Sequence, residues 1–413
     1  MPAAESGARF ARALAASPFP LSVHPDRRAM IWDVLIIGGG PAGSTAAAEL
    51  ARRGYRVGVL DRATFPRAKL CGEFLAPSGV ALLERQGLLE AALRAGARPV
   101  REAVFVSARG SRYRIPLNRF PEGRGFGLGI SRAALDQLLL QHARALGADV
   151  LEGAFVTDSI SRRGRTIGVT ARMRPSGRCA ALCAPIIIDA SGRARALSAR
   201  SPCSIGEGRS RLFAFQLHVS GVEGLDDAVE LYFYPFGYGG LVRIENDLYN
   251  LCALTTREVM RRAGNHFERL LTLTLRQNPV ARERLRGARP EGPLRGCGPL
   301  DFGPRALPCD HLAIGDAAAQ VDPFMGQGIS MALESGLLAA ELVEATFRAG
   351  DLTRLASRYH QAFRRRFARR WRAAAGLRLA TGEVNDWVLR WLPERARLQR
   401  LILRGIFGER MGS

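Results

Sequence analysis

The sequence predicts an α/β fold that combines a Rossmann-type dinucleotide-binding domain with an inserted antiparallel β-sheet domain and C-terminal helices. Three observations lead to this prediction. A glycine-rich turn follows an apolar run that begins at Trp32. Two more apolar runs, at 185–188 and 311–314, each end in a polar turn, which is typical of buried parallel strands. Between them, residues 211–254 alternate short runs of β-forming residues with turn residues.

The glycine-rich turn has the spacing G-x-G-x-x-G, and a second apolar run after it ends in an acid. The first glycine allows a tight turn, the second lets the backbone approach a pyrophosphate, and the third lets helix and strand pack closely. The helix N-terminus adds unpaired N–H groups and positive dipole charge, and the acid can accept hydrogen bonds from a ribose. We therefore predict a bound dinucleotide. The residues expected to contact it are Gly38, Gly40, Pro41, Ala42, Gly43, Asp61 and Arg62.

A second set of turns lies far downstream, after the run 311–314, and precedes a long apolar-periodic helix from residue 329 to about residue 348. Together with the first turn, this segment resembles the flavoprotein monooxygenases built like p-hydroxybenzoate hydroxylase. Within them it resembles the branch that holds geranylgeranyl reductases and flavin-dependent halogenases. The resemblance implies a glutathione reductase-like FAD domain, so FAD is the expected dinucleotide. The residues that it assigns to FAD here are Gly315, Asp316, Pro323, Gly326 and Gly328.

Each of these assignments has a stated role. In the family, the Gly-Asp motif places an aspartate on the flavin ribityl chain, which Asp316 would do here. The Pro-x-x-Gly-x-Gly segment borders the flavin ring. A helix that begins near Gly328 would direct its positive end at the flavin, which favours the negative charge that develops on reduction.

Two further segments add candidate cofactor contacts. The run 185–188 ends in Asp189 and resembles the family's middle motif, usually Asp-Gly followed by Ser and Arg. Ala190 stands where the glycine usually is, which leaves Asp189 as a candidate but weakens an NADPH contact by this loop. Arg132 opens an amphipathic helix that matches a recurrent family segment near the flavin. For Arg132, a cofactor contact and an ordinary surface position on a capped helix are both open.

The segment after Asp61 contains the candidate catalytic residues. It includes Lys69, Cys71 and Gly72. Geranylgeranyl reductases have a similar sequence in a loop near the flavin. Lys69 is also the only lysine of the chain, which uses arginine for its other basic residues. An ammonium is a compact, titratable charge and a guanidinium is not, so a function at this position could require a lysine. The alternative is that this single lysine is accidental, and both interpretations are open. We hypothesise that Lys69 and Cys71 face the flavin pocket.

The inserted sheet is expected to form the roof of the active site. The predicted strands are 104–117, 212–219, 229–234, 240–244 and 248–253. Aromatic side chains at alternating strand positions suggest a substrate cavity, although ordinary core packing is the alternative interpretation. The candidate substrate residues are Tyr232, Tyr234 and Tyr238, with Phe213 and Phe215.

The sheet's own signature is incomplete. At the corresponding strand, related reductases have a motif like Gly-Tyr-x-Trp-x-Phe-Pro, and halogenases have the motif Trp-x-Trp-x-Ile-Pro. This chain keeps Tyr238, but Gly240 replaces the tryptophan and Arg243 the proline. We therefore rank halogenation low among the possible functions. The motif of the reductases that act on polyprenyl lipids is also incomplete in this chain.

Two reactions of reduced FAD follow from the resemblance. A monooxygenase would use oxygen to hydroxylate or epoxidise an electron-rich substrate, whereas a reductase would deliver hydride to a carbon–carbon double bond beside a proton-donating acid. We expect an apolar or aromatic small molecule and rank the monooxygenase first. The alternative is a geranylgeranyl reductase-like reaction on a lipid or polyketide-like molecule, and a flavin-binding protein without turnover ranks below both. No second Rossmann fingerprint is present in the sequence, so NAD(P)H would bind transiently or a ferredoxin-type protein would donate electrons.

The composition is typical of a cytoplasmic enzyme. The seven cysteines have no regular spacing, which argues against a disulfide scaffold and a metal site. No run has the length of a transmembrane helix. The net charge of +22 is not accompanied by a nucleic-acid-binding motif, so we expect no nucleic-acid partner.

The predicted domain boundaries follow the motifs. Residues 1–29 are expected to be a disordered extension or the result of a start codon assigned too early. The FAD-binding segments are 30–100, 126–200 and 290–345, and the sheet domain comprises 101–125 and 201–289. Residues 346–413 are expected to form arginine-rich helices. A basic helix with Phe and Trp could lie on an anionic membrane, giving a membrane-peripheral location; we favour an apolar stripe that packs on the FAD domain.

Overall fold

A five-stranded parallel sheet forms the centre of the first domain in the computed structural model, which describes residues 32–381 except 121–122, 198–211, 236, 265, 301 and 306. Four of its strands are short, largely apolar runs that are fully buried, as parallel strands require, and the fifth, at the edge of the sheet, is only partly buried. In spatial order they are β19 (Leu312–Ala313), β12 (Ile186–Asp189), β1 (Val34–Ile37), β2 (Val57–Asp61) and β8 (Asp149–Glu152).

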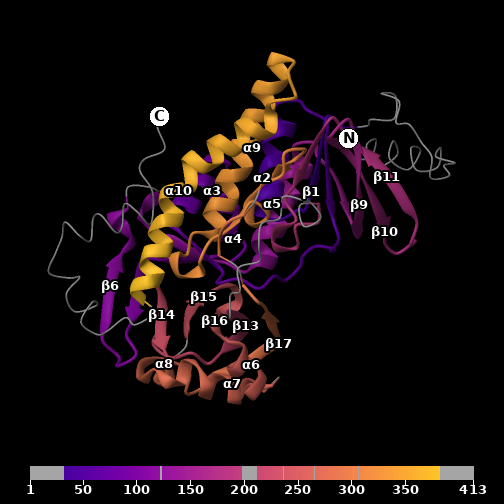
Figure 1. Ribbon diagram of the computed structural model, residues 1–413. Coiled ribbons are helices and arrows are strands. Elements are labelled where there is room, and N and C mark those ends of the chain that lie inside the picture. The colour runs from indigo at the N-terminus through magenta and orange to yellow at the C-terminus, as the bar shows by residue number, and fades with distance from the viewer. Residues whose placement is uncertain are drawn as a thin grey trace.

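Different layers cover the two faces of the parallel sheet (Figure 1). Val34 and Ile36 of β1 pack with the helices on one face, whereas Leu35 and Ile37 pack on a three-stranded antiparallel sheet on the other. The helices are α2 (Pro41–Arg52), α5 (Arg132–Ala145) and α9 (Gly328–Ala349). The covering strands are β9 (Ala154–Arg162), β10 (Arg165–Met173) and β11 (Cys179–Cys183).

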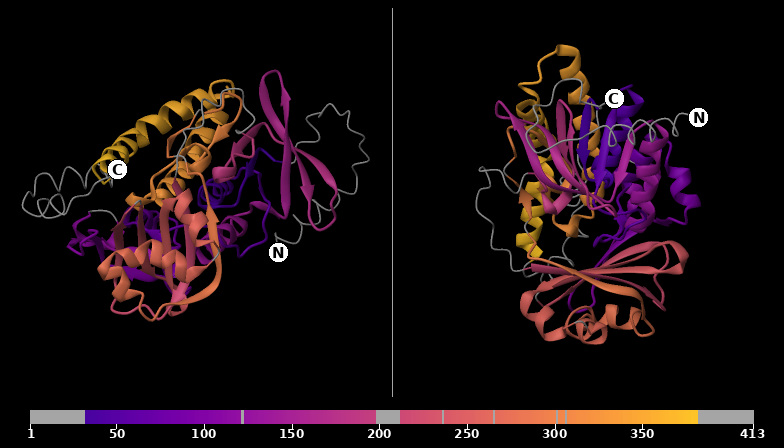
Figure 2. Two further views of the ribbon diagram at one scale, coloured as in Figure 1. Left: turned by 60° about the horizontal axis from the view of Figure 1, so that its bottom comes forward. Right: turned by 90° about the vertical axis from the view of Figure 1, so that its right-hand side faces the viewer.

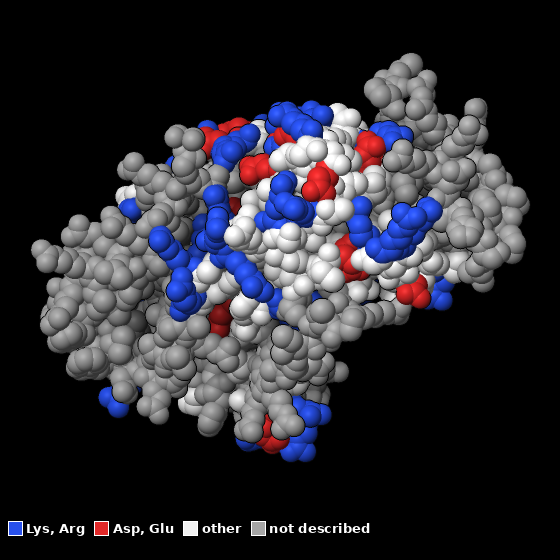
Figure 3. Space-filling view, turned by 45° about the horizontal axis from the view of Figure 1, so that its top comes forward, with Lys and Arg blue, Asp and Glu red and all other residues white. Residues whose placement is uncertain are grey.

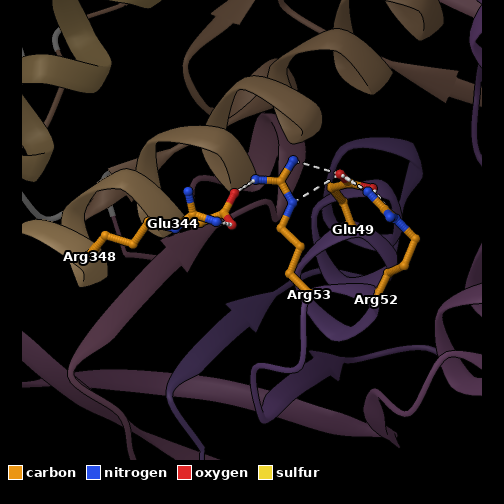
Figure 4. Close-up of polar contacts among 5 residues, drawn as sticks. All are labelled: Glu49, Arg52, Arg53, Glu344 and Arg348. Carbon is orange, nitrogen blue, oxygen red and sulfur yellow. Dashed lines mark hydrogen bonds and ion pairs between the residues drawn. The ribbon is translucent and has the colours of Figure 1, made fainter.

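Helices α2 and α9 approach each other closely at Gly336. A Cβ atom on Gly336 would lie 2.4 Å from the Ala42 carbonyl oxygen, so any larger residue would push the helices apart. At their far ends, Arg53 of α2 pairs with Glu344 of α9 and with Glu49, whose carboxylate is 2.6 Å away (Figure 4). The full network contains Glu49, Arg52, Arg53, Glu344 and Arg348.

Helix α10 (Leu355–Thr381) lies along α9 and adds its aromatic side chains to the core of the first domain. Tyr359, Phe363 and Phe367 are buried there, and Arg370 forms a buried ion pair with Glu334 of α9 at 2.6 Å. The apolar stripe therefore packs on the first domain, as the favoured interpretation of the arginine-rich segment expected. Residues 382–413, which contain the other tryptophans of this segment, lie outside the described residues, as does the predicted extension 1–29.

The second domain is a seven-stranded sheet. Three short helices cover the face that points away from the first domain, which we call the far face (Figure 2). The strands pair antiparallel, apart from the parallel pair β14–β5. In spatial order they are β17 (Arg289–Cys297), β13 (Leu212–Ser220), β16 (Tyr249–Thr256), β15 (Gly237–Arg243), β14 (Ala228–Tyr234), β5 (Glu102–Val106) and β6 (Arg112–Pro116). The helices are α6 (Arg257–Ala263), α7 (Phe267–Leu273) and α8 (Pro279–Arg284).

One predicted boundary is displaced. Residues 290–297 were expected to begin the third FAD-binding segment, but they belong to β17, which pairs with β13 at the edge of the seven-stranded sheet. The remaining short elements lie between the domains or line their junction. They are β3 (Phe74–Leu75), β4 (Arg98–Val100), β7 (Gly127–Gly129), α3 (Pro77–Arg85), α4 (Leu89–Arg94), β18 (Gly303–Pro304) and β20 (Ala319–Gln320).

Candidate active site

A large cavity lies between the two domains, outside the carboxyl ends of β1, β12 and β19, where open α/β sheets bind ligands. Its empty space is about 1850 Å³, part of it open to solvent. The first domain contributes the turns that follow these strands. The second domain contributes the face of its sheet that carries Ala214, Leu231, Gly240, Cys252 and Leu254.

The glycine fingerprint forms the wall of the cavity at α2. Gly38 has φ +111°, which favours glycine, and a Cβ atom on Gly43 would lie 1.9 Å from the Gly38 carbonyl oxygen. No side chain caps α2, and its first residues, Pro41 and Ala42, line the cavity together with Gly40. The unpaired N–H groups of a helix N-terminus therefore lie at the cavity wall, where an anion would be stabilised.

Asp61 supports this turn from beneath. Its buried carboxylate accepts hydrogen bonds from the Gly39 N–H at 2.9 Å and from the Ala63 N–H at 2.9 Å. Arg62 is exposed. The predicted contacts of Asp61 and Arg62 with a cofactor stay predictions, because the bonds formed here explain the carboxylate as part of the turn itself.

The downstream turns lie beside the start of α2, because a Cβ atom on Gly315 would be 3.0 Å from the Ala42 Cβ. Gly315 and Asp316 line the cavity, as do Pro323, Gly326 and Gly328. Helix α9 begins at Gly328, where the sequence predicted a helix start. The residue before it, Gln327, is 1% exposed, and among the described residues its Nε2 donor has no hydrogen-bond partner. A buried donor of this kind costs free energy unless a ligand or water accepts its hydrogen bond.

The middle motif contributes backbone to the cavity, and its acid does not line it. Asp189 is buried and its carboxylate accepts hydrogen bonds from Ser191 and from the Leu197 N–H, so it organises its own turn. The neighbouring Ala190 and Gly192 line the cavity instead. The prediction that Asp189 contacts the cofactor is therefore not supported by the direction of its bonds.

Arg132 is buried at the cavity and not on the surface. Its guanidinium forms a two-point ion pair with Asp136, at 2.7 and 2.8 Å, and Arg67 pairs with the same carboxylate at 3.1 Å. Of the two open interpretations of Arg132, the surface position is wrong. A cofactor contact stays a prediction.

Lys69 and Cys71 both line the cavity, in agreement with the hypothesis that they face the pocket. The Lys69 Nζ would lie 2.8 Å from a Cβ atom on Gly192, so the amine packs directly on that turn. Burial, together with the positive charge of Arg132, lowers the pKa of Lys69. Burial also raises the pKa of the Cys71 thiol. Their catalytic roles remain hypotheses.

The aromatic residues predicted to bind substrate divide between the two faces of the sheet. Tyr238 lines the cavity, and its hydroxyl donates to the Asp322 carboxylate. Tyr232 and Tyr234 are buried on the far face, in the core with α6–α8, so their assignment to the cavity is wrong. Phe215 lies in the same core. The cause is strand alternation, because Val229 and Leu231 occupy the cavity face of β14 and the tyrosines point away from it.

Polar residues that the sequence did not single out hold the Cys71 loop. Gln216 and Asn250 bond to the backbone of Cys71, and His218 contacts Glu73. The sequence contains a partial indication of these residues, because Gln216 and His218 interrupt an otherwise apolar strand. It contains no indication of their partners.

The described residues contain no cluster of three His, Cys, Asp or Glu side chains that could hold a metal ion. Among the helices described above, none is both long and apolar enough to cross a membrane.

Comparison with known proteins identifies the family. Residues 32–223 match the family model of an FAD binding domain. The menaquinone reductase of Mycobacterium tuberculosis is 31% identical over 373 residues, which cover 80% of this chain and 81% of that protein. The chain therefore belongs to this family of FAD-dependent oxidoreductases. The family includes enzymes of different chemistry. The 1H-pyrrole-2-carbonyl-(peptidyl-carrier protein) chlorinase of Pseudomonas fluorescens is 25% identical over 372 residues, 82% of each protein.

A solved structure agrees with this assignment. The myxobacterial chondrochloren halogenase is 26% identical, with a TM-score of 0.76 over 91% of this chain and 89% of that one. The chain is therefore an FAD-dependent enzyme with the Rossmann-type fold that the sequence predicted. The resemblance to geranylgeranyl reductases and flavin halogenases is confirmed at the level of the superfamily.

The residues of the cavity fit FAD. The turn at Gly38 and Gly43 has no space for side chains, which is what close approach of a pyrophosphate requires. The uncapped start of α2 would hold the phosphates. Asp316 lines the same cavity and would be the residue available to the ribityl hydroxyls.

Proposed function

We propose that this FAD-dependent oxidoreductase reduces a carbon–carbon double bond in an apolar, polyprenyl-like substrate. The observation that carries the proposal is the set of apolar side chains that lines the cavity under the sheet of the second domain, which we call the apolar lobe; Cys71 lines the same cavity. The similarity to a protein named menaquinone reductase supports a reductase over an oxygenase. This proposal reverses the ranking drawn from the sequence, which placed a monooxygenase first.

The apolar lobe lies under strands β5, β6 and β14 of the second domain. It is lined by Phe74, Ala103, Phe105, Ile115, Leu117, Phe120, Val229 and Leu231. Transfer of apolar surface into such a lobe contributes about 25 cal/mol per Å² buried, so several isoprene-sized units would supply most of the binding free energy. A charged head group would lose its hydration there without gaining a partner, so it would remain outside.

Reduction of a double bond needs hydride at one carbon and a proton at the other. Bound FAD, once reduced, supplies the hydride. The Cys71 thiol is suited to donate the proton, because it lines the cavity and burial raises its pKa, which keeps it protonated at neutral pH. The Arg132 guanidinium lies within hydrogen-bonding reach of the sulfur and would stabilise the thiolate that remains.

An anaerobic experiment tests the proposal. The purified flavoprotein is reduced with a limiting amount of dithionite, and isoprenoid quinones and polyprenols are then added while flavin absorbance is followed without oxygen. A C=C reductase regains its oxidised flavin spectrum on addition of substrate. Because reduction of a quinone ring to the quinol also re-oxidises flavin, products are re-oxidised in air before mass spectrometry, which then finds two added hydrogens in the polyprenol or in the quinone side chain. A flavin that stays reduced with every substrate until oxygen is admitted contradicts the proposal.

Oxygen-dependent chemistry, either monooxygenation or halogenation, is the second candidate function. The similarity to the chlorinase and to the halogenase structure favours it. Admission of oxygen to the reduced enzyme, with phenols or polyenes and with or without chloride or bromide, distinguishes these reactions. Substrate-dependent oxygen uptake with an oxygenated or halogenated product would replace the reductase by this candidate.

The reductant and the partners also belong to the proposal. We infer that NAD(P)H or a ferredoxin-type protein reduces the flavin, and anaerobic bleaching by NADPH, NADH or reduced ferredoxin distinguishes them. The exposed arginines of α10, including Arg358, Arg364 and Arg365, would suit transient contact with an anionic membrane. Lys and Arg side chains gather over part of the face shown in Figure 3, with Asp and Glu among them. Flotation with anionic liposomes at low salt tests that contact, and absence of co-migration contradicts it.

A further inference from the structure

The loop that carries Cys71 belongs to the first domain but is bonded to the sheet of the second. The Cys71 N–H donates to the Gln216 Oε1 at 3.2 Å. The Gln216 Nε2 donates to the Asn250 Oδ1 at 2.7 Å, and the Asn250 Nδ2 donates to the Cys71 carbonyl oxygen at 3.0 Å. These three bonds close a ring through three residues, which we call the carboxamide ring.

The carboxamide ring fixes both polar groups of the Cys71 backbone. Each bond has a single direction, because an amide nitrogen donates and an amide oxygen accepts, so the ring closes only with both side-chain amides in the orientation described. The Cys71 N–H and C=O belong to two successive peptide units, so the ring restrains the backbone on both sides of the Cys71 Cα. The point from which the thiol projects is therefore fixed relative to the sheet.

Burial shows that the two carboxamides depend on the loop for their hydrogen bonds. Gln216 and Asn250 are each 1% exposed, on a sheet face whose neighbouring positions are Ala214, Cys252 and Leu254. Amide groups removed from water at such positions are costly unless they are hydrogen-bonded. In this structure their partners are each other and Cys71.

A second connection continues along the same strand. His218, two residues after Gln216 on β13, contacts the Glu73 carboxylate at 2.7 Å, and the other oxygen of that carboxylate accepts the Arg132 N–H at 2.9 Å. Glu73 is buried and has φ +52°, a conformation that residues other than glycine rarely adopt. Such a conformation persists where surrounding bonds determine it, so the loop is held on both sides of Gly72.

We propose that Gln216 and Asn250 are positioning residues that hold the Cys71 loop, and with it the thiol, at the cavity wall. Neither residue touches the reacting atoms in this assignment; each acts through the Cys71 backbone. The catalytic consequence rests on the proposed function, in which Cys71 donates a proton. The positioning itself does not, because it is a property of the loop in either chemistry.

Site-resolved alkylation of the FAD-loaded protein tests the positioning. Asn250→Leu and Gln216→Met replace each carboxamide by an apolar side chain of similar size. With iodoacetamide and peptide mass spectrometry, we expect alkylation at Cys71 to accelerate about tenfold, the factor that corresponds to loss of one buried hydrogen bond. Alkylation at Cys297, which lines the same cavity from β17 but lies outside the ring, is expected to stay within twofold of the parent.

Tyr249→Phe provides the matched control. Tyr249 precedes Asn250 on β16, points to the other face, and donates to the Leu225 carbonyl oxygen at 3.0 Å. Its loss removes one buried hydrogen bond from the same strand without touching the loop, so Cys71 should keep its parental rate. If Asn250→Leu does not fold, Asn250→Asp serves instead, because it keeps the acceptor for Gln216 and loses the donor to Cys71. An unchanged Cys71 rate in the folded variants, or an equal rise at Cys297, overturns the proposal.

Turnover separates this proposal from the proposed function. In a C=C reductase, Asn250→Leu should lower kcat about tenfold with little change in KM, because the lobe under β5 and β14 is untouched. Rapid alkylation of Cys71 together with parental kcat would overturn the catalytic part. Absence of C=C reduction in the parent protein would overturn the proposed function, while the alkylation result would still decide the positioning.

Discussion

Replacement of Tyr238 by phenylalanine would test the bond that joins the second domain to the flavin-side turn. The Tyr238 hydroxyl donates to the Asp322 carboxylate and accepts the Phe324 N–H at 2.9 Å. Burial, reinforced by Asp322, holds the pKa of Tyr238 well above its ordinary value, so the hydroxyl is a donor throughout the neutral range. Asp322 is 4% exposed and begins the turn that carries Pro323 and Gly326 into the cavity.

The size of the effect follows from which groups would lose partners. The Phe324 N–H also donates to Asp322 at 3.1 Å, so it would stay bonded in the variant. The carboxylate would lose one charge-assisted donor, an interaction of about 1.5–3 kcal/mol. Because the tyrosine hydroxyl also gives up its own desolvation cost, we expect Tyr238→Phe to lower the free energy of unfolding by about 1–2 kcal/mol. A turn held less firmly should weaken FAD binding by about tenfold, since each 1.4 kcal/mol is a factor of ten.

The assay compares two variants of the same kind. Tyr234→Phe also removes a buried tyrosine hydroxyl, which donates to the Leu254 carbonyl oxygen at 2.8 Å on the far face of the sheet. Urea unfolding should show a loss of about 1 kcal/mol for Tyr234→Phe, and titration of apoprotein with FAD should show unchanged affinity. If Tyr238→Phe retains parental FAD affinity and loses no more stability than Tyr234→Phe, the reasoning that this bond positions the flavin-side turn is refuted.

Three further predictions concern the cofactor turn, the C-terminal helix and pH. Gly43→Ala puts a Cβ atom 1.9 Å from a backbone oxygen, so the purified variant should retain less than about a tenth of the parental flavin by absorbance. Arg370→Met leaves the buried Glu334 carboxylate with only its longer ion pair to Arg366, at 3.4 Å, and urea unfolding should show a loss of about 1–3 kcal/mol. The hydrogen bond with His311 lowers the pKa of Asp310 from 3.8 to about 2, so its stabilisation is present above about pH 4 and is lost as the pH falls toward 2. Asp310→Asn should therefore lower Tm at pH 6 and leave it unchanged near pH 2.

Each of these predictions has its own control. Gly296→Ala lies outside the cavity, adds a Cβ atom in ordinary contact at 3.6 Å from the Met260 side chain, and should keep its flavin. Combining Arg370→Met with Glu334→Leu removes the weakly paired carboxylate, so the double variant should be more stable than Arg370→Met alone. Flavin retained by Gly43→Ala, a double variant that is no more stable, or a Tm difference for Asp310→Asn that persists at pH 2 would each contradict the corresponding argument.

The sequence predicted the parts of the site whose physical cause is local. Gly38 and Gly43 are required by a turn that spans six residues, and the start of α9 at Gly328 follows from a glycine turn before a long apolar-periodic run. Buried parallel strands such as β1 are continuous apolar runs, so four of the five were predicted. Strand β8, which is only partly apolar and partly buried, was not. Function at the level of an FAD-dependent oxidoreductase follows from these elements.

The face of the second sheet was not accessible in the same way. Alternation predicts that Tyr232 and Tyr234 share a face, but it does not say which layer covers that face. The answer depends on α6–α8, which come later in the chain and pack on the tyrosines. The partners of Cys71 are harder still, because Gln216 and Asn250 lie 145 and 179 residues away and only the register of β13 with β16 brings them together.

Gly240 shows both what the sequence predicts and what only the structure adds. It stands where related enzymes have tryptophan, and this difference weakened the sequence-based prediction of halogenation and of prenyl reduction. In the structure Gly240 lines the cavity, and a Cβ atom there would lie 3.5 Å from the Glu230 carbonyl oxygen and 4.0 Å from Leu231, which is ordinary contact. Backbone strain or crowding at its first carbon therefore does not require a glycine. A large side chain would instead have to occupy the cavity itself, so a glycine at this position gives the apolar lobe room. The residue at position 240 thus limits the size of the substrate that fits the cavity. Cys71 and the carboxamide ring instead determine, in our proposal, the proton transfer to that substrate.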